Sequence, residues 1–293
     1  MQSYRIDTTD RAWFKRCRRA WDLGARARHS YEPVGAPDGP TIPGALAEAL
    51  AVYYFPGMWA WDRAIVAPLV HQGLDRAAGP RLGTAGAHAL LERYGAWAPR
   101  VDRFTPVQVA TDIELNVPDP LLSDSHLATA DGTPVRFATR VDALVLDDAD
   151  DQPRLLCHRV GWGPFSDPEL LALDEVALTT CWAWEQYTLD LRIGGILFNE
   201  VRLDGEGEDF RRTVVPVSRT ELELAGRQLG REVLDMLDAG LSPYPNPAPE
   251  WCSMCAFRAP CRAMRAGRDP EPVLASQYRR RPPPPLVEGH LGG

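Results

Sequence analysis

The sequence is nearly without lysine, and it has no long apolar run. Lys15 is the only lysine, so arginine supplies almost all of the positive charge. A mechanism that needs a lysine side chain anywhere else in the chain is therefore excluded. No apolar stretch is long enough to span a membrane and no signal peptide is evident, so we expect a cytoplasmic protein with no membrane partner and no disulfide bonds.

The charge of the chain is unevenly distributed. The formal net charge of −8 over 293 residues argues against indiscriminate binding of nucleic acid over the whole surface. Residues 1–30 hold eight Lys and Arg against three Asp, and residues 251–281 hold seven Arg against two acidic residues. If both segments fold into one lobe, we expect a polyanion to dock there. A solvated arginine-rich surface is the alternative.

Three of the six cysteines lie close together in a C-x2-C-x5-C pattern, Cys252, Cys255 and Cys261. This spacing is typical of thiolates that bind one metal centre, and Cys17 is the best candidate for a fourth ligand. Chance proximity and disulfide bonds are the alternatives. The spacing does not distinguish zinc from an iron–sulfur cluster.

The hydrophobic pattern changes from a helical period to a period of two after residue 103 and predicts an α/β protein. We expect Cys17 to lie on the first helix. The predicted helices cover residues 10–29, 43–53, 62–98 with an interruption near 79–80, 174–187 and 219–239. The predicted strands cover residues 104–115, 135–146, 155–160, 193–203 and 211–217.

The strands at 135–146 and 155–160 flank an acidic turn and predict a β-hairpin. Its symmetry places Asp142 opposite Cys157, and strand alternation gives one face four charged or reactive side chains. That face would carry Arg140, Asp142, Cys157 and Arg159. One β-bulge would change this arrangement. A small buried hydrophobic residue is the alternative for Cys157, and it is our expectation for Cys181.

The order of these features resembles the iron–sulfur branch of the RecB-like PD-(D/E)XK nucleases. This branch includes the CRISPR-associated adaptation exonucleases and the AddB-type helicase–nuclease subunits, and the similarity covers roughly residues 10–265. The resemblance implies a restriction-endonuclease-like core, a central mixed sheet flanked by helices, and an iron–sulfur lobe made from both chain ends. In that lobe a four-iron, four-sulfur (4Fe-4S) cluster, rather than zinc, would be held by Cys17, Cys252, Cys255 and Cys261. The implied domains are the lobe, residues 1–30 plus 245–268; the nuclease-like core, residues 31–244; and a flexible Pro/Arg-rich tail, residues 269–293.

The sequence departs from this family at its catalytic motif. The family places an acidic residue at Glu48 and a metal-binding aspartate at Asp142. Cys157 and Arg159 stand where its second carboxylate and its lysine belong, and Val176 and Thr180 stand where its glutamine and tyrosine belong. Magnesium prefers oxygen ligands, and arginine stays protonated, so it cannot act as a base. We therefore expect a pseudo-nuclease, catalytically impaired or inactive, that acts as a DNA-binding accessory or scaffold subunit.

The alternative is an active deoxyribonuclease that uses Mg²⁺ or Mn²⁺ to cut DNA as an exonuclease or endonuclease. Glu48, Asp142 and Glu114 would then hold the metal ion, with Arg159 clamping the phosphate. The expected partners are single-stranded or duplex DNA, a protein in a larger complex, or both. The candidate DNA-binding residues are Lys15, Arg16, Arg18, Arg19, Arg140, Arg258 and Arg262.

Overall fold

A computed structural model describes residues 3–35, 41–80, 82–122, 124–189, 191–205 and 207–281. The chain divides into two compact units. Unit 1 consists of Met1–Ala36, Leu127–Phe137 and Glu232–Gly293. Unit 2 consists of Pro37–His126 and Ala138–Arg231. Within the described ranges, no helix combines the length and the apolar character needed to cross a membrane.

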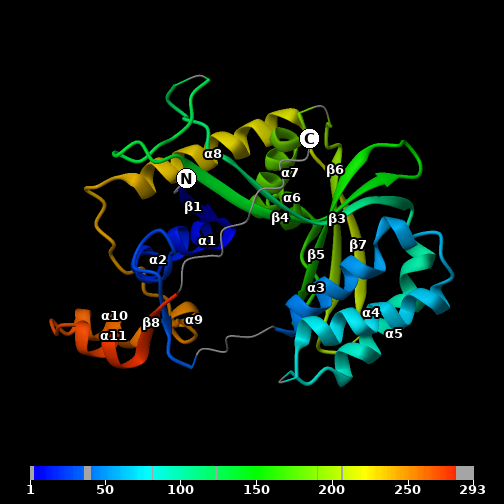
Figure 1. Cartoon of the computed structure of the whole chain (residues 1–293), viewed down its shortest axis with the longest axis horizontal. Helices are drawn as coiled ribbons and strands as arrows, with labels where there is room; N and C mark the ends of the chain where they lie inside the picture. Colours follow the sequence, from blue (N-terminus) through cyan, green and yellow to red (C-terminus); the bar gives the residue numbers. More distant parts are fainter. Residues whose placement is uncertain are drawn as a thin grey trace. The chain divides into compact units, whose positions relative to one another are not determined.

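Unit 1 brings the first and last parts of the described chain side by side (Figure 1). Its elements are β1 (Tyr4–Asp7), α1 (Thr8–Arg16), α2 (Arg18–Gly24), β2 (Tyr31–Pro33), α9 (Pro249–Cys252), α10 (Arg258–Arg265), α11 (Glu271–Gln277) and β8 (Tyr278–Arg280). A small hydrophobic core joins α2 to the C-terminal segment and consists of Ala20, Leu23, Phe257, Leu274 and Tyr278. Because these side chains come from α2 and from the described C-terminal segment, these two parts of the chain fold as one body.

The single helix expected over residues 10–29 is two helices in the structure. α1 begins after Asp7, whose carboxylate accepts a hydrogen bond from the backbone N–H of Asp10 at 2.9 Å. Cys17 separates α1 from α2 in an extended conformation, with φ −162° and ψ 105°. The expectation that Cys17 lies on a helix is therefore wrong, because the residue forms the bend between two helices.

Part of the expected flexible tail is folded. α11 and β8 follow Arg268, and β8 pairs with β2 in an antiparallel two-stranded sheet. The phenol of Tyr278 donates a hydrogen bond of 2.6 Å to the carbonyl of Ala256, and its ring stacks on Phe257 at 5.7 Å. The prediction of flexibility from residue 269 is wrong for this segment because Leu274 and Tyr278 are buried. Residues 282–293 lie outside the described part of the chain.

Unit 2 contains most of a six-stranded mixed sheet and the helices on its faces (Figure 1). Its elements are α3 (Ile42–Tyr53), the 3-10 helix η1 (Pro56–Met58), α4 (Arg63–Ala78), α5 (Ala85–Val101), β3 (Phe104–Asn116), β5 (Pro153–Gly161), α6 (Pro168–Ala172), α7 (Glu175–Thr188), β6 (Gly195–Arg202) and β7 (Phe210–Pro216). Strand β4 (Val135–Asp147) and helix α8 (Arg219–Leu237) contribute residues to both units.

The sheet has the strand order β1-β4-β5-β6-β7, with β3 also paired to β4. β4 and β5 are antiparallel, β5 and β6 are parallel, and β6 and β7 are antiparallel. The predicted α/β class with a mixed sheet is confirmed. The predicted hairpin register is also confirmed for four pairs, from Ala143 opposite Leu156 to Leu146 opposite Pro153.

Two helical layers pack against the part of the sheet in unit 2. Apolar side chains of α3, α4 and α5, such as Leu46, Leu50 and Leu74, form one core with Leu156 of β5 and Leu197 of β6. Burying a leucine side chain contributes about 1.5–3 kcal/mol, so this core is a main source of stability.

Helix α7 is buried along most of its length, and Cys181 is fully buried in it, as expected for a small hydrophobic residue. Helix α8 packs closely against it. A Cβ atom on Gly226 would lie 2.4 Å from the indole nitrogen of Trp182, so only glycine permits this approach.

Candidate functional site

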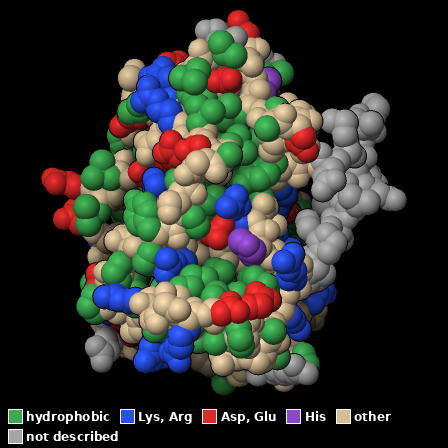
Figure 2. All heavy atoms as spheres, turned by 90° about the vertical axis from the view of Figure 1, so that its left-hand side faces the viewer, with side chains coloured by type: hydrophobic (Ala, Val, Ile, Leu, Met, Phe, Trp, Pro, Cys, Tyr) green, Lys and Arg blue, Asp and Glu red, His purple; other side chains and the backbone are tan. Residues whose placement is uncertain are grey.

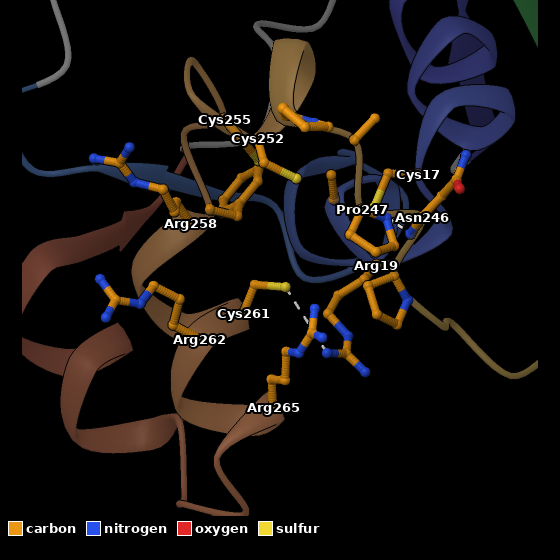
Figure 3. A pocket seen from close by; sticks show the side chains of 15 residues that line it. Cys17, Arg19, Asn246, Pro247, Cys252, Cys255, Arg258, Cys261, Arg262 and Arg265 are labelled. Atoms are coloured by element: carbon orange, nitrogen blue, oxygen red, sulfur yellow. Dashed lines mark hydrogen bonds between the residues drawn. The ribbon is translucent and has the colours of Figure 1, made fainter.

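The four cysteines of the expected cluster site line one cavity in unit 1. The cavity has a volume of about 370 Å³ and lies beneath the bend at Cys17. Figure 3 shows Cys17 on one side of the cavity, and Cys252, Cys255 and Cys261 on the side of α9 and α10. The fold thus brings together the four thiols that are far apart in the sequence.

Hydrogen bonds to the proline-rich segment before α9 fix the position of Cys17. The backbone N–H of Asn246 donates to the Sγ atom of Cys17 at 3.5 Å, and the Asn246 side-chain amide donates to the carbonyl of Arg16 at 3.1 Å. The backbone N–H of Arg19 donates to the carbonyl of Tyr244 at 3.2 Å. Because the bend between α1 and α2 leaves these backbone groups outside the helical ladder, the segment at 244–246 can bind them.

The other three cysteines lie on the short segment that runs from α9 to α10. Cys252 ends α9, Cys255 follows it in the turn, and Cys261 lies in the second half of the motif on α10. The guanidinium of Arg19 lies 3.9 Å from the Sγ atom of Cys261, and Figure 3 shows both at the lower side of the cavity. Burial raises the pKa of the Cys255 thiol, with a smaller contribution from Cys17 and Cys252. A cation near the sulfur atoms favours thiolates, which are the form that binds metals.

Four thiols around one cavity suggest two kinds of metal centre, a single zinc ion or an iron–sulfur cluster. Four thiolates bound to one zinc ion at about 2.3 Å lie within about 4 Å of one another. In the described part of the chain, no group of three Cys, His, Asp or Glu side chains is arranged to hold a single metal ion. The thiols instead surround a space of about 370 Å³. Four thiolates are a standard ligand set for one zinc ion and for an iron–sulfur cluster alike, so the cavity fits either kind of centre.

The second candidate site lies on β4 and β5 in unit 2. The carboxylate of Asp142 accepts a hydrogen bond from the backbone N–H of His158 at 2.7 Å. Burial raises the pKa of the Cys157 thiol to about 12, and the nearby carboxylate of Asp142 adds to this shift. The thiol is therefore protonated at neutral pH and offers neither a charge nor an oxygen atom to a hard cation.

Arg159 is held by two contacts on the same face. Its guanidinium forms an ion pair with Asp174, which is the N-cap residue of α7, and lies 5.6 Å from the centre of the Phe198 ring. Cys157 and Arg159 alternate with Leu156, which belongs to the core under α3–α5. These two side chains and Asp142 therefore face the α7 side of the sheet, as predicted.

Arg140 does not share that face. The hydroxyl of Thr139 lies 2.9 Å from the hydroxyl of Thr180 on α7, whereas Ala143 packs into the core on the α3 side. Residues an even number of positions apart share a face in a regular strand, so the alternation breaks between Thr139 and Ala143. Arg140 accordingly turns toward α3 and forms an ion pair of 2.8 Å with Glu48. The prediction of one common face is wrong for Arg140.

The carboxylates of the alternative metal site do not form one group. Glu48 is paired with Arg140, Asp142 is bonded to the backbone of His158, and Glu114 is exposed on β3. Among the described residues, these three carboxylates are not grouped closely enough to hold one metal ion.

A buried polar network on the α3 side of the sheet was not predicted from the sequence. Arg212 of β7 donates to the carboxylate of Asp102 at 2.7 Å and to the phenol of Tyr94 at 2.9 Å, and it also donates to Asn199 and Tyr54. Burial alone would lower the pKa of Arg212, but Tyr94, Tyr54 and Asp102 raise it overall, so the guanidinium stays charged. Isolated polar residues within apolar strands, such as Asn199, are the sequence signal that indicates such a network.

His158 joins this network in a defined tautomer. Arg212 can only donate, so the amide oxygen of Asn199 faces it and the amide nitrogen faces Nδ1 of His158 at 2.7 Å. Nδ1 must therefore accept, and the proton lies on Nε2, which is buried without a hydrogen-bond partner among the described residues. Burial lowers the pKa of His158 to about 4.

Six of the seven candidate DNA-binding residues lie in unit 1. Lys15 forms an ion pair of 2.6 Å with Glu232. The guanidinium of Arg16 lies 4.9 Å from the centre of the Trp251 ring, and that of Arg18 lies 5.2 Å from the centre of the Tyr244 ring. Arg19, Arg258 and Arg262 line the cysteine cavity. The seventh residue, Arg140, belongs to unit 2.

No protein-family model and no curated protein sequence matches the chain. Solved structures with a similar fold include the crystal structure of a provisionally assigned exonuclease from Eubacterium rectale. It has a TM-score of 0.50 and 9% sequence identity, and the match covers 88% of this chain and 87% of that chain. The crystal structure of SSO0001 has a TM-score of 0.38 and 11% identity, and the match covers 88% of this chain and 86% of that chain. The likeness to the first structure is one of fold.

Proposed function

We propose that this chain is a PD-(D/E)XK nuclease-fold protein with an impaired or inactive catalytic site, and that it serves as a DNA-binding accessory or scaffold subunit. The main support for the proposal is that Cys157 and Arg159 lie beside Asp142 on one face of the sheet, where the nuclease family has a second carboxylate and a lysine. The similarity of fold to a structure described as an exonuclease supports the nuclease fold.

The three candidate catalytic residues on this face are poorly suited to metal-dependent hydrolysis. The Asp142 carboxylate is already bonded to a backbone N–H, and Cys157 is a protonated thiol. Arg159 forms an ion pair with Asp174, and its guanidinium remains protonated at any working pH. Magnesium binding needs several oxygen ligands, and activation of water needs a base. They supply a single carboxylate and no lysine, and the fourth member of the candidate set, Glu48, forms an ion pair with Arg140.

We further propose that Cys17, Cys252, Cys255 and Cys261 hold a 4Fe-4S cluster in the cavity of unit 1. The four thiols around one cavity support a thiolate-bound centre, and the resemblance to the iron–sulfur branch of the nucleases favours a cluster over a single zinc ion. A bound cluster would join the bend between α1 and α2 to the segment containing α9 and α10 by covalent iron–sulfur bonds. Its role would then be to hold the two chain ends together.

We assign DNA binding to the arginines on the segments around the cysteine cavity of unit 1. Arg16, Arg18, Arg19, Arg258 and Arg262 lie on the segments that surround the cavity. Contacts between guanidinium groups and phosphates release counterions from DNA, so the affinity of such a surface falls steeply as salt is added. A scaffold without DNA contacts would instead bind a protein partner and respond little to salt or DNA.

Nuclease assays distinguish the proposal from the active alternative. The purified protein is incubated with single-stranded and duplex DNA in Mg²⁺ or Mn²⁺, with Asp142→Ala as the matched variant. We expect no degradation by either protein, and salt-dependent DNA binding by both. Metal-dependent degradation by the wild type that Asp142→Ala abolishes would establish an active nuclease. If the wild type binds no DNA, it is not a DNA-binding accessory subunit, and the scaffold role is the one that stands.

A further inference from the structure

Two aromatic rings stand exposed beside the cysteine cavity in unit 1. Trp251 is 45% exposed and immediately precedes Cys252, and Tyr244 is 53% exposed at the start of the segment that holds Cys17. An exposed tryptophan and an exposed tyrosine on one small unit are apolar surface that the core does not use. Aromatic rings of this kind are the usual platform on which unpaired nucleic-acid bases stack.

Each ring is paired with one arginine. The guanidinium of Arg16 lies 4.9 Å from the centre of the Trp251 ring, and that of Arg18 lies 5.2 Å from the centre of the Tyr244 ring. One guanidinium covers one face of a ring, and the exposed fractions of Trp251 and Tyr244 show that each side chain still has open surface. A stacked guanidinium also keeps N–H groups at its edge, and these can donate to phosphate oxygens.

The backbone around the two rings is held in place. The carbonyl of Tyr244 accepts a hydrogen bond from the backbone N–H of Arg19, and the backbone N–H of Trp251 donates to the carbonyl of Ala248 at 3.2 Å. A platform that is already ordered loses little conformational freedom when it binds a ligand.

The segment of unit 1 that carries both rings and the cavity beside it are rich in arginine. Residues 244–268 contain four arginines and one acidic residue, Glu250. Arg262 and Arg265 are exposed on α10 and line the cavity, and within the described ranges neither forms an ion pair with a carboxylate. Figure 3 shows Arg258 and Arg262 extending outward on the side of the cavity away from Cys17, and Arg265 below Cys261 with its side chain directed toward the cavity. In Figure 2, Lys and Arg side chains (blue) lie beside hydrophobic side chains (green) over the lower part of the visible face, next to a group of acidic side chains (red).

We infer that unit 1 binds single-stranded nucleic acid, with bases stacked on Trp251 and Tyr244 and the phosphate backbone held by Arg258, Arg262 and Arg265. A duplex keeps its bases stacked inside the helix, so it can use the arginines but not the two rings. The inference rests on the proposed binding of DNA. It adds that the DNA is single-stranded and that Trp251 and Tyr244 give this preference.

Fluorescence anisotropy with labelled oligo(dT) and with a labelled duplex tests the inference on the full chain. The double variant Trp251→Ala with Tyr244→Ala removes both rings. It is expected to bind oligo(dT) about tenfold or more weakly, because each base stacked on an aromatic ring contributes to the binding free energy. Its affinity for the duplex is expected to stay within about twofold of the wild-type value. Arg262→Gln with Arg265→Gln is expected to lower the salt dependence of binding to both ligands. The matched control is Trp162→Ala, because Trp162 is 70% exposed in unit 2.

The outcomes separate this inference from the proposed function. Stacking is supported if Trp251→Phe keeps its affinity for oligo(dT) while the double alanine variant loses it. The loss then follows the absence of an aromatic ring and not a failure of the protein to fold. Wild-type affinity for oligo(dT) in the double alanine variant overturns the platform while DNA binding stands. An equal loss for oligo(dT) and duplex also overturns it. If the wild type binds neither ligand, both the inference and the proposed DNA binding fail. If the wild type binds oligo(rU) as tightly as oligo(dT), the site recognises bases and phosphates in either nucleic acid. If it binds oligo(rU) more weakly, the site is specific for single-stranded DNA.

Discussion

The Asp142 carboxylate and the backbone N–H of His158 form a hydrogen bond of 2.7 Å where the ladder between β4 and β5 ends. The last backbone pair before it is Ala143 opposite Leu156. The side chain thus satisfies a donor that the strand partner no longer reaches. Asp142, which the sequence predicts to bind a metal ion, therefore also stabilises the end of this ladder.

Asp142→Ala is expected to lower the free energy of unfolding by about 1–3 kcal/mol, because it leaves a partly buried N–H without an acceptor. Asp142→Asn keeps an acceptor oxygen at the same place and is expected to cost less than half as much. Urea denaturation of the three proteins measures the difference. Equal destabilisation by Ala and Asn would show that the charge of Asp142, and not its hydrogen bond, stabilises the fold.

The proposed cluster predicts that the purified wild-type protein is brown and contains iron, and that Cys17→Ser loses most of the iron and the colour, because it removes one of the four cysteine side chains around the cavity. The variant is also expected to increase cleavage by protease in unit 1, where the cavity joins the two chain ends. Cys181→Ser is the matched control, since Cys181 is buried in α7 and lies outside the cavity. Iron and sulfide are measured per chain. Zinc in place of iron in the wild type would contradict the cluster. An unchanged iron content in Cys17→Ser would show that Cys17 is not a ligand.

Restoring the missing catalytic groups tests the interpretation of the site in unit 2. Cys157→Asp places a carboxylate beside Asp142, and Arg159→Lys provides a side chain that can lose its proton. The double variant is expected to bind Mn²⁺ at least tenfold more tightly than the wild type, because manganese and magnesium favour carboxylate oxygens. Titration calorimetry measures the affinity, and Arg159→Lys alone is the control. If the double variant gains no Mn²⁺ affinity, the position of Cys157 is not that of a lost metal ligand.

Local patterns predicted part of this structure well. The hairpin register follows from the symmetry of two apolar strands around an acidic turn, and it holds for the four pairs from Ala143 to Leu146. The association of Cys17 with the three distant cysteines was predicted from ligand number, and the fold places all four around one cavity. In both cases a few residues and their spacing contain the necessary information.

Other features depend on contacts that no local pattern contains. The break in alternation between Thr139 and Ala143 arises where Thr139 meets α7 and Ala143 meets the α3 layer. The folding of residues 271–280 depends on the core that Leu274 shares with the N-terminal helices. The network around Arg212 joins side chains from widely separated elements, so single polar residues in apolar strands indicate it only after the fold is known.

His158 gives the folded protein a defined dependence on acid. Burial lowers its pKa to about 4, whereas the unfolded chain has the ordinary value of about 6.5. The unfolded state therefore binds the proton more readily between these values. The contribution of His158 to stability is fully present above pH 6.5 and is lost as the pH falls toward 4, by on the order of 3 kcal/mol in total. Protonation at Nδ1 also ends its hydrogen bond with the Asn199 amide.

His158→Leu is expected to remove this part of the pH dependence. The variant is less stable than the wild type at pH 7, since the amide nitrogen of Asn199 loses its acceptor. Between pH 7 and pH 5, however, the wild type is expected to lose about 2 kcal/mol more of its unfolding free energy than the variant does. Urea denaturation of both proteins at a series of pH values measures the two slopes. Parallel slopes would mean that His158 titrates alike in the folded and unfolded chains, and that its burial in the Arg212 network has no effect on its protonation.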